Sequence, residues 1–121
     1  VHPGYLPDLK GADGLFWSIY KFEKIGMSLF HMNEQIDQGK IFTRNYYQFE
    51  KINNKHLIRL SHSDKYNFLL SSFDPILRAK FFMEYGIDSL HRGSYIENKA
   101  GNYHTFMKDY ELDEAYKKIF Y

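Results

Sequence analysis

The spacing of apolar residues near the start of the chain predicts a first helix. Leu15, Ile19 and Phe22 follow one another at i, i+4 and i+7, which places them on a single helical face. Asp13 stands just before this stretch, where a carboxylate can accept hydrogen bonds from the first free backbone N–H groups. We therefore expect a helix over residues 14–22 with Asp13 as its N-cap.

Two short stretches after this helix have the pattern of strands. Residues 27–32 (MSLFHM) form an apolar run too short for a helix, and Gly26 is expected to end the connection before it. Residues 33–39 are polar, and residues 40–49 (KIFTRNYYQF) alternate well enough for a second strand. The pattern therefore predicts a buried strand, a polar loop and a second strand.

The following stretch, residues 54–85, is predicted to be helical in pieces, because its apolar positions follow a helical period. Asp74 followed by Pro75 has the pattern of a cap and a first-turn proline, so we expect a new helix to begin there. Gly86 is expected to stop that helix, since glycine commonly follows a helix C-terminus.

The remaining segments complete one domain. Residues 1–12 hold two of the three prolines and two glycines, which is typical of an ordered loop. Residues 87–108 show no regular period, and residues 112–120 can form a last helix. Since the chain contains no repeat and no low-complexity linker, we expect a single α/β domain with two short strands plus helices.

Composition narrows the classes of protein to which the chain can belong. Hydrophobic residues make up 44% and aromatic residues 19% of the 121 positions, enough for a folded core. Sixteen basic and fifteen acidic residues give a net charge of +1, so neither a nucleic-acid partner nor a membrane partner is expected. The absence of cysteine excludes disulfides and thiolate metal sites. No apolar run approaches the roughly 20 residues that span a bilayer, and no signal peptide is visible, so a cytoplasmic location is expected.

Two residues stand out as candidates for acid–base chemistry. His2 precedes a proline-rich turn, and Pro3 restricts the backbone next to the imidazole. Asp37 lies in the loop between the two predicted strands, where α/β sheets usually present their sites. A histidine and a carboxylate that meet can share acid–base work, because the carboxylate fixes the tautomer and favours the imidazolium. Spacing alone does not pair residues so far apart in the sequence.

The residues around His2 and Asp37 resemble the motifs of the folate-dependent formyltransferase family. Residues 1–11 (VHPGYLPDLKG) resemble its signature Asn-x-His-Pro-Ser-x-Leu-Pro-x-x-Arg-Gly. Residues 26–41 (GMSLFHMNEQIDQGKI) resemble its Gly-Val-Thr-Ile-His-x-Met-Asp-Glu-Gly-Ile-Asp-Thr-Gly-x-Ile, in the same order and at the same separation. A looser match is GNYH at residues 101–104, followed by Lys108-Asp109, which resembles the Gly-Thr-Tyr-His…Lys-Asp stretch of members that formylate amino sugars.

This resemblance implies the C-terminal part of a Rossmann-like formyltransferase domain over residues 1–121, with the N-terminal half missing. It implies transfer of a formyl group from 10-formyltetrahydrofolate to a primary amine. His2 and Asp37 match the catalytic residues, and we expect their side chains to converge at one end of the sheet. His104 matches a substrate-binding position. The expected folate-binding residues are Glu34, Gln35 and Ile36.

The family's catalytic asparagine would stand immediately before Val1, and the chain begins without an initiator methionine. We therefore expect the chain to be a piece of a longer protein and to be inactive alone. We also expect apolar surface to be exposed along residues 27–32, where the rest of the sheet belongs.

The sequence departs from the family's pattern in places that change the candidate list. The family's strand histidine falls on Phe30, and His31 stands one position later, where strand alternation points it to the other face. His31 is therefore expected to be structural. Gln35 replaces a glycine and puts a side chain into the folate loop. His56 and His62 lack the carboxylate spacing of a metal site, so both are expected to be surface residues and no metal is expected.

The resemblance leaves the acceptor open. The GNYH block, and the absence of an appended RNA-binding barrel, favour a nucleotide-linked amino sugar. Formylation of an initiator methionyl-tRNA or of glycinamide ribonucleotide is the alternative within enzymes, and the near-neutral charge argues against RNA. From a different class, the chain is compatible with a truncated piece that binds a partner without turnover. A homodimer also fits the sequence.

Overall fold

The computed structural model describes residues 1–121 as a mixed α/β arrangement of strands, α-helices and two π-helical segments. In chain order these are β1 (Lys10–Gly11), α1 (Gly14–Phe22), β2 (Ile25–Phe30), β3 (Ile41–Tyr47), α2 (Lys55–Ile58), α3 (His62–Phe68), η1 (Leu69–Phe73), α4 (Asp74–Phe81), η2 (Phe82–Gly86), α5 (Ile87–Arg92), β4 (Tyr103–His104) and α6 (Asp109–Ile119). The helix predicted over residues 14–22 is confirmed, as are the second strand and the last helix. None of the helices is long and apolar enough to cross a bilayer.

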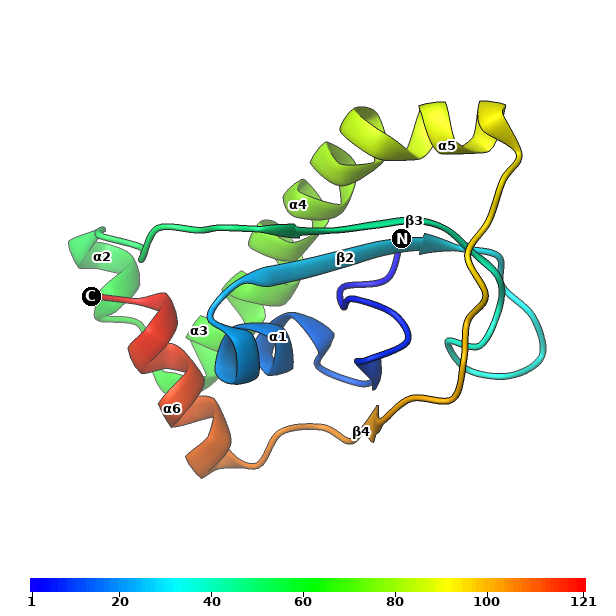
Figure 1. Cartoon of the computed structure of the whole chain (residues 1–121). Helices are drawn as coiled ribbons and strands as arrows, with labels where there is room; N and C mark the ends of the chain where they lie inside the picture. Colours follow the sequence, from blue (N-terminus) through cyan, green and yellow to red (C-terminus); the bar gives the residue numbers. More distant parts are fainter.

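The central sheet is built from the antiparallel pair β2 and β3, which lie side by side in Figure 1. His2 forms an antiparallel bridge to Ser28, so the N-terminal segment extends the sheet on the side of β2 away from β3. Gly26 was expected to precede the first strand, but it lies inside β2. A side chain there would collide with the backbone of Tyr5, so this glycine allows the N-terminal loop to pack closely.

Burial along β2 contradicts the expectation of an exposed apolar edge over residues 27–32. Met27 is fully buried, because the N-terminal segment and β3 flank the strand on its two sides. Met32, beyond the end of β2, is 79% exposed. Within residues 27–32, the only exposed apolar side chain is therefore that of Met32, after the strand has ended.

The helical region departs most from the sequence prediction, because α3, η1, α4, η2 and α5 follow one another without a break. Asp74 is not a cap, since the preceding residue, Phe73, already has helical dihedral angles. Pro75 has no N–H to donate, and the turn before it widens into the π-helical η1 instead of ending. The helix also passes through Gly86 and stops at Gly93, which adopts a left-handed φ of 67°.

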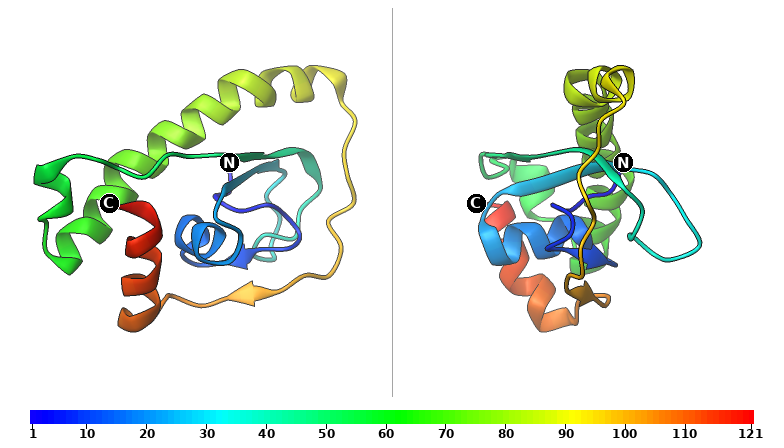
Figure 2. Two further views of the ribbon diagram at one scale, coloured as in Figure 1. Left: turned by 60° about the vertical axis from the view of Figure 1, so that its left-hand side comes forward. Right: turned by 45° about the vertical axis from the view of Figure 1, so that its right-hand side comes forward.

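After the long helix, the rest of the chain returns to the N-terminal loop and ends in α6. Residues 87–108 were predicted to be irregular, but residues 87–92 form α5. Residues 93–108 leave α5 on the side of the molecule away from α6, pass through β4 and then lead to the start of α6 (Figures 1 and 2). β4 pairs in parallel with β1, with Gly11 opposite His104. This pairing brings the return segment next to the N-terminal loop that carries His2.

A hydrophobic core of 13 buried residues lies between α1, β2, the α3–α5 helix and α6. Phe16 of α1, Met27 of β2 and Ile119 of α6 are each fully buried in it. Burying a side chain of this size contributes about 1.5–3 kcal/mol to stability. The core therefore fixes α1 and β2, the two elements between which the N-terminal loop is held.

Candidate active site

His2 is held by both its backbone and its ring. Its N–H donates to the Ser28 carbonyl (2.8 Å), and its own carbonyl accepts from the Ser28 N–H (3.0 Å). The residue is 6% exposed, and its Nε2 lies 2.8 Å from the carbonyl oxygen of Leu9. Because a carbonyl oxygen can only accept, Nε2 carries a hydrogen, and Nδ1 is the nitrogen that gains or loses a proton.

Asp37 reaches His2 from the loop between β2 and β3. Its backbone is left-handed, with a φ of 54°, a conformation that aspartate tolerates better than most residues. Asp37 Oδ2 accepts a hydrogen bond from the Gly11 N–H at 2.8 Å, and Oδ1 lies 3.5 Å from His2 Nδ1. The predicted convergence of His2 and Asp37 is therefore confirmed, while their catalytic roles stay a prediction.

The surroundings of His2 favour the neutral form of its imidazole. Burial lowers the pKa of His2 below its usual range, and the nearby Asp37 carboxylate opposes this shift without reversing it. In the neutral form, Nδ1 and Asp37 Oδ1 are two acceptors that face each other without a hydrogen between them. Such a pair suits a ligand that brings hydrogens, and the carboxylate stabilises the imidazolium once Nδ1 is protonated.

A cavity of about 460 Å³ opens beside the pair. Its charged lining residues are Asp13, Asp37, Asp74 and Arg78, and the neutral His2 lies among them. Its apolar lining residues are Val1, Leu15, Phe30, Met32, Ile36 and Leu70. Three carboxylates against one guanidinium make the cavity negatively charged, which favours a cationic ligand.

Asp13 was predicted to cap α1 and does not. It stands at the N-cap position with a left-handed φ of 53°, but its side chain makes no capping hydrogen bond. Instead, Oδ1 accepts from the Tyr66 hydroxyl (2.6 Å) and Oδ2 accepts from the Met107 N–H (2.9 Å). The carboxylate therefore connects the N-terminal loop to α3 and to the segment before α6. Both of its oxygens are bound to these partners, so neither is left to accept from the first N–H groups of α1.

Asp74 and Arg78 were missed as lining residues. Asp74 is 2% exposed, and its Oδ2 accepts from Arg78 Nε (2.8 Å) and Nη2 (2.6 Å). The i, i+4 spacing of the two residues is visible in the sequence and indicates an ion pair. Their place in the cavity depends on how the long helix packs, which the spacing does not reveal.

The predicted folate-binding residues lie beside Asp37 on an exposed loop. Glu34, Gln35 and Ile36 line a smaller cavity of about 190 Å³ that also includes Phe30 and Asp37. Ile36 is 71% exposed, and the neighbouring Met32 is similarly open. The loop therefore offers apolar surface next to the His2–Asp37 pair, and its binding role stays a prediction.

His104, the predicted substrate-binding residue, is not among the residues that line the His2–Asp37 cavity. It lies in β4, with its ring centroid 5.0 Å from that of Trp17 and its Nδ1 3.1 Å from the Asn102 carbonyl oxygen. Its strand partner is Gly11, the residue whose N–H donates to Asp37. His104 is thus connected to the site through backbone pairing, and contact with substrate stays a prediction.

Three further histidines, His31, His56 and His62, were assigned from the sequence to places outside the site. His56 is exposed, as expected. His31, expected to be structural, is also exposed, and neither residue lines the cavity at His2. His62 was expected on the surface, but it is half-buried, with Nε2 lying 3.2 Å from Asp113 Oδ1. Its ring packs against Tyr116 at 5.1 Å, because α6 lies across α3 at this point.

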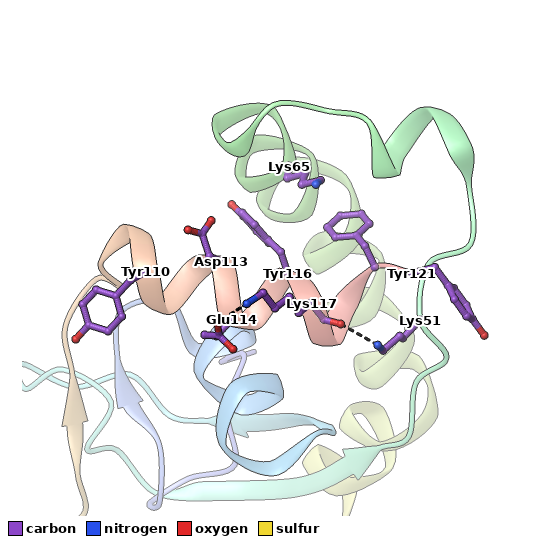
Figure 3. A pocket seen from close by; sticks show the side chains of 9 residues that line it. Lys51, Lys65, Tyr110, Asp113, Glu114, Tyr116, Lys117 and Tyr121 are labelled. Carbon is purple, nitrogen blue, oxygen red and sulfur yellow. Dashed lines mark hydrogen bonds and ion pairs between the residues drawn. The ribbon is translucent and has the colours of Figure 1, made fainter.

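A second cavity, of about 550 Å³, lies on the outer face of α6 and is shown in Figure 3. Its lining is rich in lysine and tyrosine, but several of the charged groups are already paired with one another. Lys117 binds Glu114 at 2.6 Å, and Lys51 donates to the Lys117 carbonyl at 2.8 Å. No histidine lines this cavity, so the His2–Asp37 cavity is the better candidate site.

Comparisons with known proteins find similarity in solved structures. No family model matches the chain, and no curated protein matches it. The formyltransferase PseJ from Anoxybacillus kamchatkensis, solved with UDP-4,6-dideoxy-4-formamido-L-AltNAc and tetrahydrofolate, matches 98% of this chain with a TM-score of 0.54 and 24% identity. Rv3404c from Mycobacterium tuberculosis, a candidate sugar N-formyltransferase, matches 86% with a TM-score of 0.50 and 22% identity.

These similarities establish the fold. The chain has the α/β fold of part of a Rossmann-like formyltransferase, as the sequence resemblance implied. It spans 62% of the PseJ chain and 40% of the Rv3404c chain, less than two thirds of either.

Proposed function

We propose that residues 1–121 form the C-terminal part of a formyltransferase catalytic domain. In this proposal the domain transfers a formyl group from 10-formyltetrahydrofolate to a primary amine, and a nucleotide-linked amino sugar is the acceptor. The observation that carries the proposal is the approach of His2 Nδ1 and Asp37 Oδ1 to 3.5 Å beside a cavity. Both residues lie in stretches of the sequence that resemble formyltransferase motifs.

The fit of a folate donor is supported by the surface next to Asp37. A pteridine ring needs apolar side chains to cover its face and free backbone groups to bind its polar edge. Met32 and Ile36 supply exposed apolar surface there, the partly buried Phe30 lines the same cavity, and residues 34–36 supply an open loop backbone. PseJ, which shares this fold, was solved with tetrahydrofolate. We therefore propose that Glu34, Gln35 and Ile36 lie against the donor, which would supply the formyl carbon as an electrophile.

The acid–base step is proposed for His2 and Asp37. An amine arrives near pH 7 mostly as an ammonium ion, and it must lose a proton before it can attack carbon. The neutral Nδ1 of His2 can take that proton, because burial has lowered the pKa of the ring. Asp37, held by the Gly11 N–H, then stabilises the imidazolium that forms. The imidazolium can return this proton to the donor nitrogen when its bond to the formyl carbon breaks, and the second proton of the ammonium leaves to solvent.

Negative charge that develops on the formyl oxygen needs a hydrogen-bond donor aimed at it. In the family's pattern an asparagine immediately before the position of Val1 would provide this donor, with the protonated His2 as its neighbour. Loss of one such donor typically lowers the rate by about 10²–10³. We therefore propose that full activity requires a longer chain than residues 1–121.

An amino-sugar acceptor is supported by two observations. The cavity beside His2 carries three carboxylates and one guanidinium, which favours an ammonium group over a phosphate. PseJ was solved with a UDP-linked formamido sugar, the kind of product that such a reaction yields. A methionyl-tRNA acceptor would require a basic surface that a net charge of +1 does not provide. We place the reaction in the cytoplasm, with no nucleic-acid or membrane partner and with a homodimer as a compatible assembly.

The test is an assay of the natural protein with 10-formyltetrahydrofolate and UDP-linked amino sugars, with glycinamide ribonucleotide and methionyl-tRNA as competing acceptors. We expect formylation of the amino sugar and release of tetrahydrofolate in equal amounts. The 121-residue chain alone is expected to show no turnover in the same assay. Turnover by that chain at ordinary enzyme rates would contradict the proposed domain boundary, and no transfer by the natural protein to any acceptor would contradict the function.

A further inference from the structure

The loop that carries Asp37 is held by side-chain donors from residues 98–103. Asn98 Nδ2 donates to the Asp37 carbonyl at 2.8 Å and to the Gly39 carbonyl at 2.7 Å. The Tyr103 hydroxyl donates to the Ile36 carbonyl at 2.7 Å. Three carbonyls within four residues of the loop are therefore bound by side chains more than 55 positions further along the chain.

This segment is itself anchored to the N-terminal loop. Lys10 is 2% exposed, and its Nζ donates to the Lys99 carbonyl at 3.1 Å. The parallel pairing of β1 with β4 fixes the following residues. Gly11, at the end of β1, donates its N–H to Asp37 Oδ2. Asp37 therefore has two anchors: its carboxylate accepts from Gly11 of β1, and its backbone carbonyl accepts from Asn98 in the segment that β1 holds.

The loop needs these hydrogen bonds because its own residues make few packing contacts. Asp37 has a left-handed backbone, a conformation that is uncommon outside glycine even though aspartate adopts it more readily than most residues. Residues 31–36 of the same loop are exposed, so few packing contacts restrain it. A carboxylate that moves by about 1 Å from its productive place can lose about 10²-fold in rate.

We propose that Asn98 is a positioning residue that holds Asp37 in place against His2. It does not touch the cavity, and it acts only through the backbone of Asp37 and Gly39. The inference rests on the proposed function, since it gives Asp37 a role in transfer. It also gives the GNYH block at residues 101–104 a physical role, because Tyr103 supports the same loop.

The variant that tests this is Asn98→Leu in the natural protein, which keeps the approximate size of the side chain and removes both donated hydrogen bonds. We expect kcat to fall about 10-fold to 100-fold, with KM for donor and acceptor within a few fold, since positioning affects the transition state more than binding. Asn98→Gln keeps the amide and is expected to recover part of kcat. Asn102→Leu, the same change in the same segment, is the matched control, because the Asn102 side chain holds no part of the loop.

A second measurement separates this inference from the proposed function. Hydrogen exchange followed by mass spectrometry is expected to show faster exchange over residues 33–41 and at Gly11 in Asn98→Leu, and unchanged exchange in Asn102→Leu. If the natural protein transfers no formyl group, the function fails while the exchange data still decide whether Asn98 holds the loop. Unchanged exchange, or kcat within twofold of an active parent, would overturn the inference. Should Asn98→Leu not fold, Asn98→Ser carries the same comparison with less steric change.

Discussion

The molecule contains two histidine–aspartate pairs, and the one with the shorter distance is not the candidate site. His62 Nε2 lies 3.2 Å from Asp113 Oδ1, whereas His2 Nδ1 lies 3.5 Å from Asp37 Oδ1. The side chains of His62 and Asp113 are 37% and 59% exposed, while those of His2 and Asp37 are 6% and 13% exposed. Exposure, and not distance, is the larger difference between the pairs.

The difference teaches what makes a pair suited to chemistry. His2 has its second ring nitrogen committed to the Leu9 carbonyl, and Asp37 has its second oxygen committed to the Gly11 N–H. The free atoms of both residues therefore face each other in one geometry, out of bulk water. Asp113 has no such support and is mostly in solvent, where an ion pair contributes about 0–1 kcal/mol.

The most severe test of this comparison replaces the carboxylate of each pair. In the natural protein, Asp37→Asn keeps the shape of the side chain but removes the charge that stabilises the imidazolium. We expect kcat for formyl transfer to fall by about 10² or more. Asp113→Asn is expected to leave kcat within a few fold. Steady-state kinetics with one acceptor, checked by circular dichroism for folding, measure both variants.

The reverse outcome would break the comparison. If Asp113→Asn were the crippled variant and Asp37→Asn nearly normal, burial and second contacts would be the wrong criteria, and the site would have to be sought on the face of α6 that Figure 3 shows.

The first third of the chain was predictable because its local patterns agree with its packing. The i, i+4, i+7 spacing of Leu15, Ile19 and Phe22 gives a helix whose bounds are confirmed. The motifs around His2 and Asp37 identified a pair that the sheet brings together. Their partners are the Leu9 carbonyl and the Gly11 N–H. Every residue has such backbone groups, so the sequence does not show which of them bind His2 and Asp37.

The second half was less predictable because packing overrides local signals there. Asp74-Pro75 and Gly86 have the pattern of a helix start and a helix stop, yet the helix runs through both, absorbing the proline in η1. The core contacts of Leu69 and Phe81 on either side favour a continuous helix over a break. Asp74 lines the cavity because the helix continues through this position, and the residues next to it in the sequence do not reveal this.

The next largest expected effect is on the pH dependence of stability, which distinguishes the buried His2 from an exposed histidine. Burial lowers the pKa of His2, so between its ordinary value near 6.5 and the lowered value the unfolded chain binds the proton and the folded chain does not. Stability from this group is therefore complete above about pH 6.5 and is lost as the pH falls through that window, by about 1.4 kcal/mol for each unit of lowering. Melting temperatures measured between pH 7.5 and 5.5 are expected to fall less steeply in His2→Gln than in the parent. A slope in His2→Gln equal to that of the parent would contradict the assignment.

The smallest expected effect concerns His31, a third histidine that stands only six positions from Asp37. It follows β2 directly after Phe30, and Phe30 is the residue whose ring packs edge-on against His2 at 6.1 Å and lines the cavity. His31 is exposed, and its backbone N–H donates to the Lys40 carbonyl (2.8 Å), an interaction that a substitution of the side chain leaves intact. We therefore expect His31→Gln to leave kcat and KM within a few fold of the parent, assayed beside Asp37→Asn with the same acceptor. A loss of about 10²-fold in His31→Gln would mean that the loop turns its other face to the substrate, because an exposed ring outside the cavity has no means of assisting proton transfer at His2.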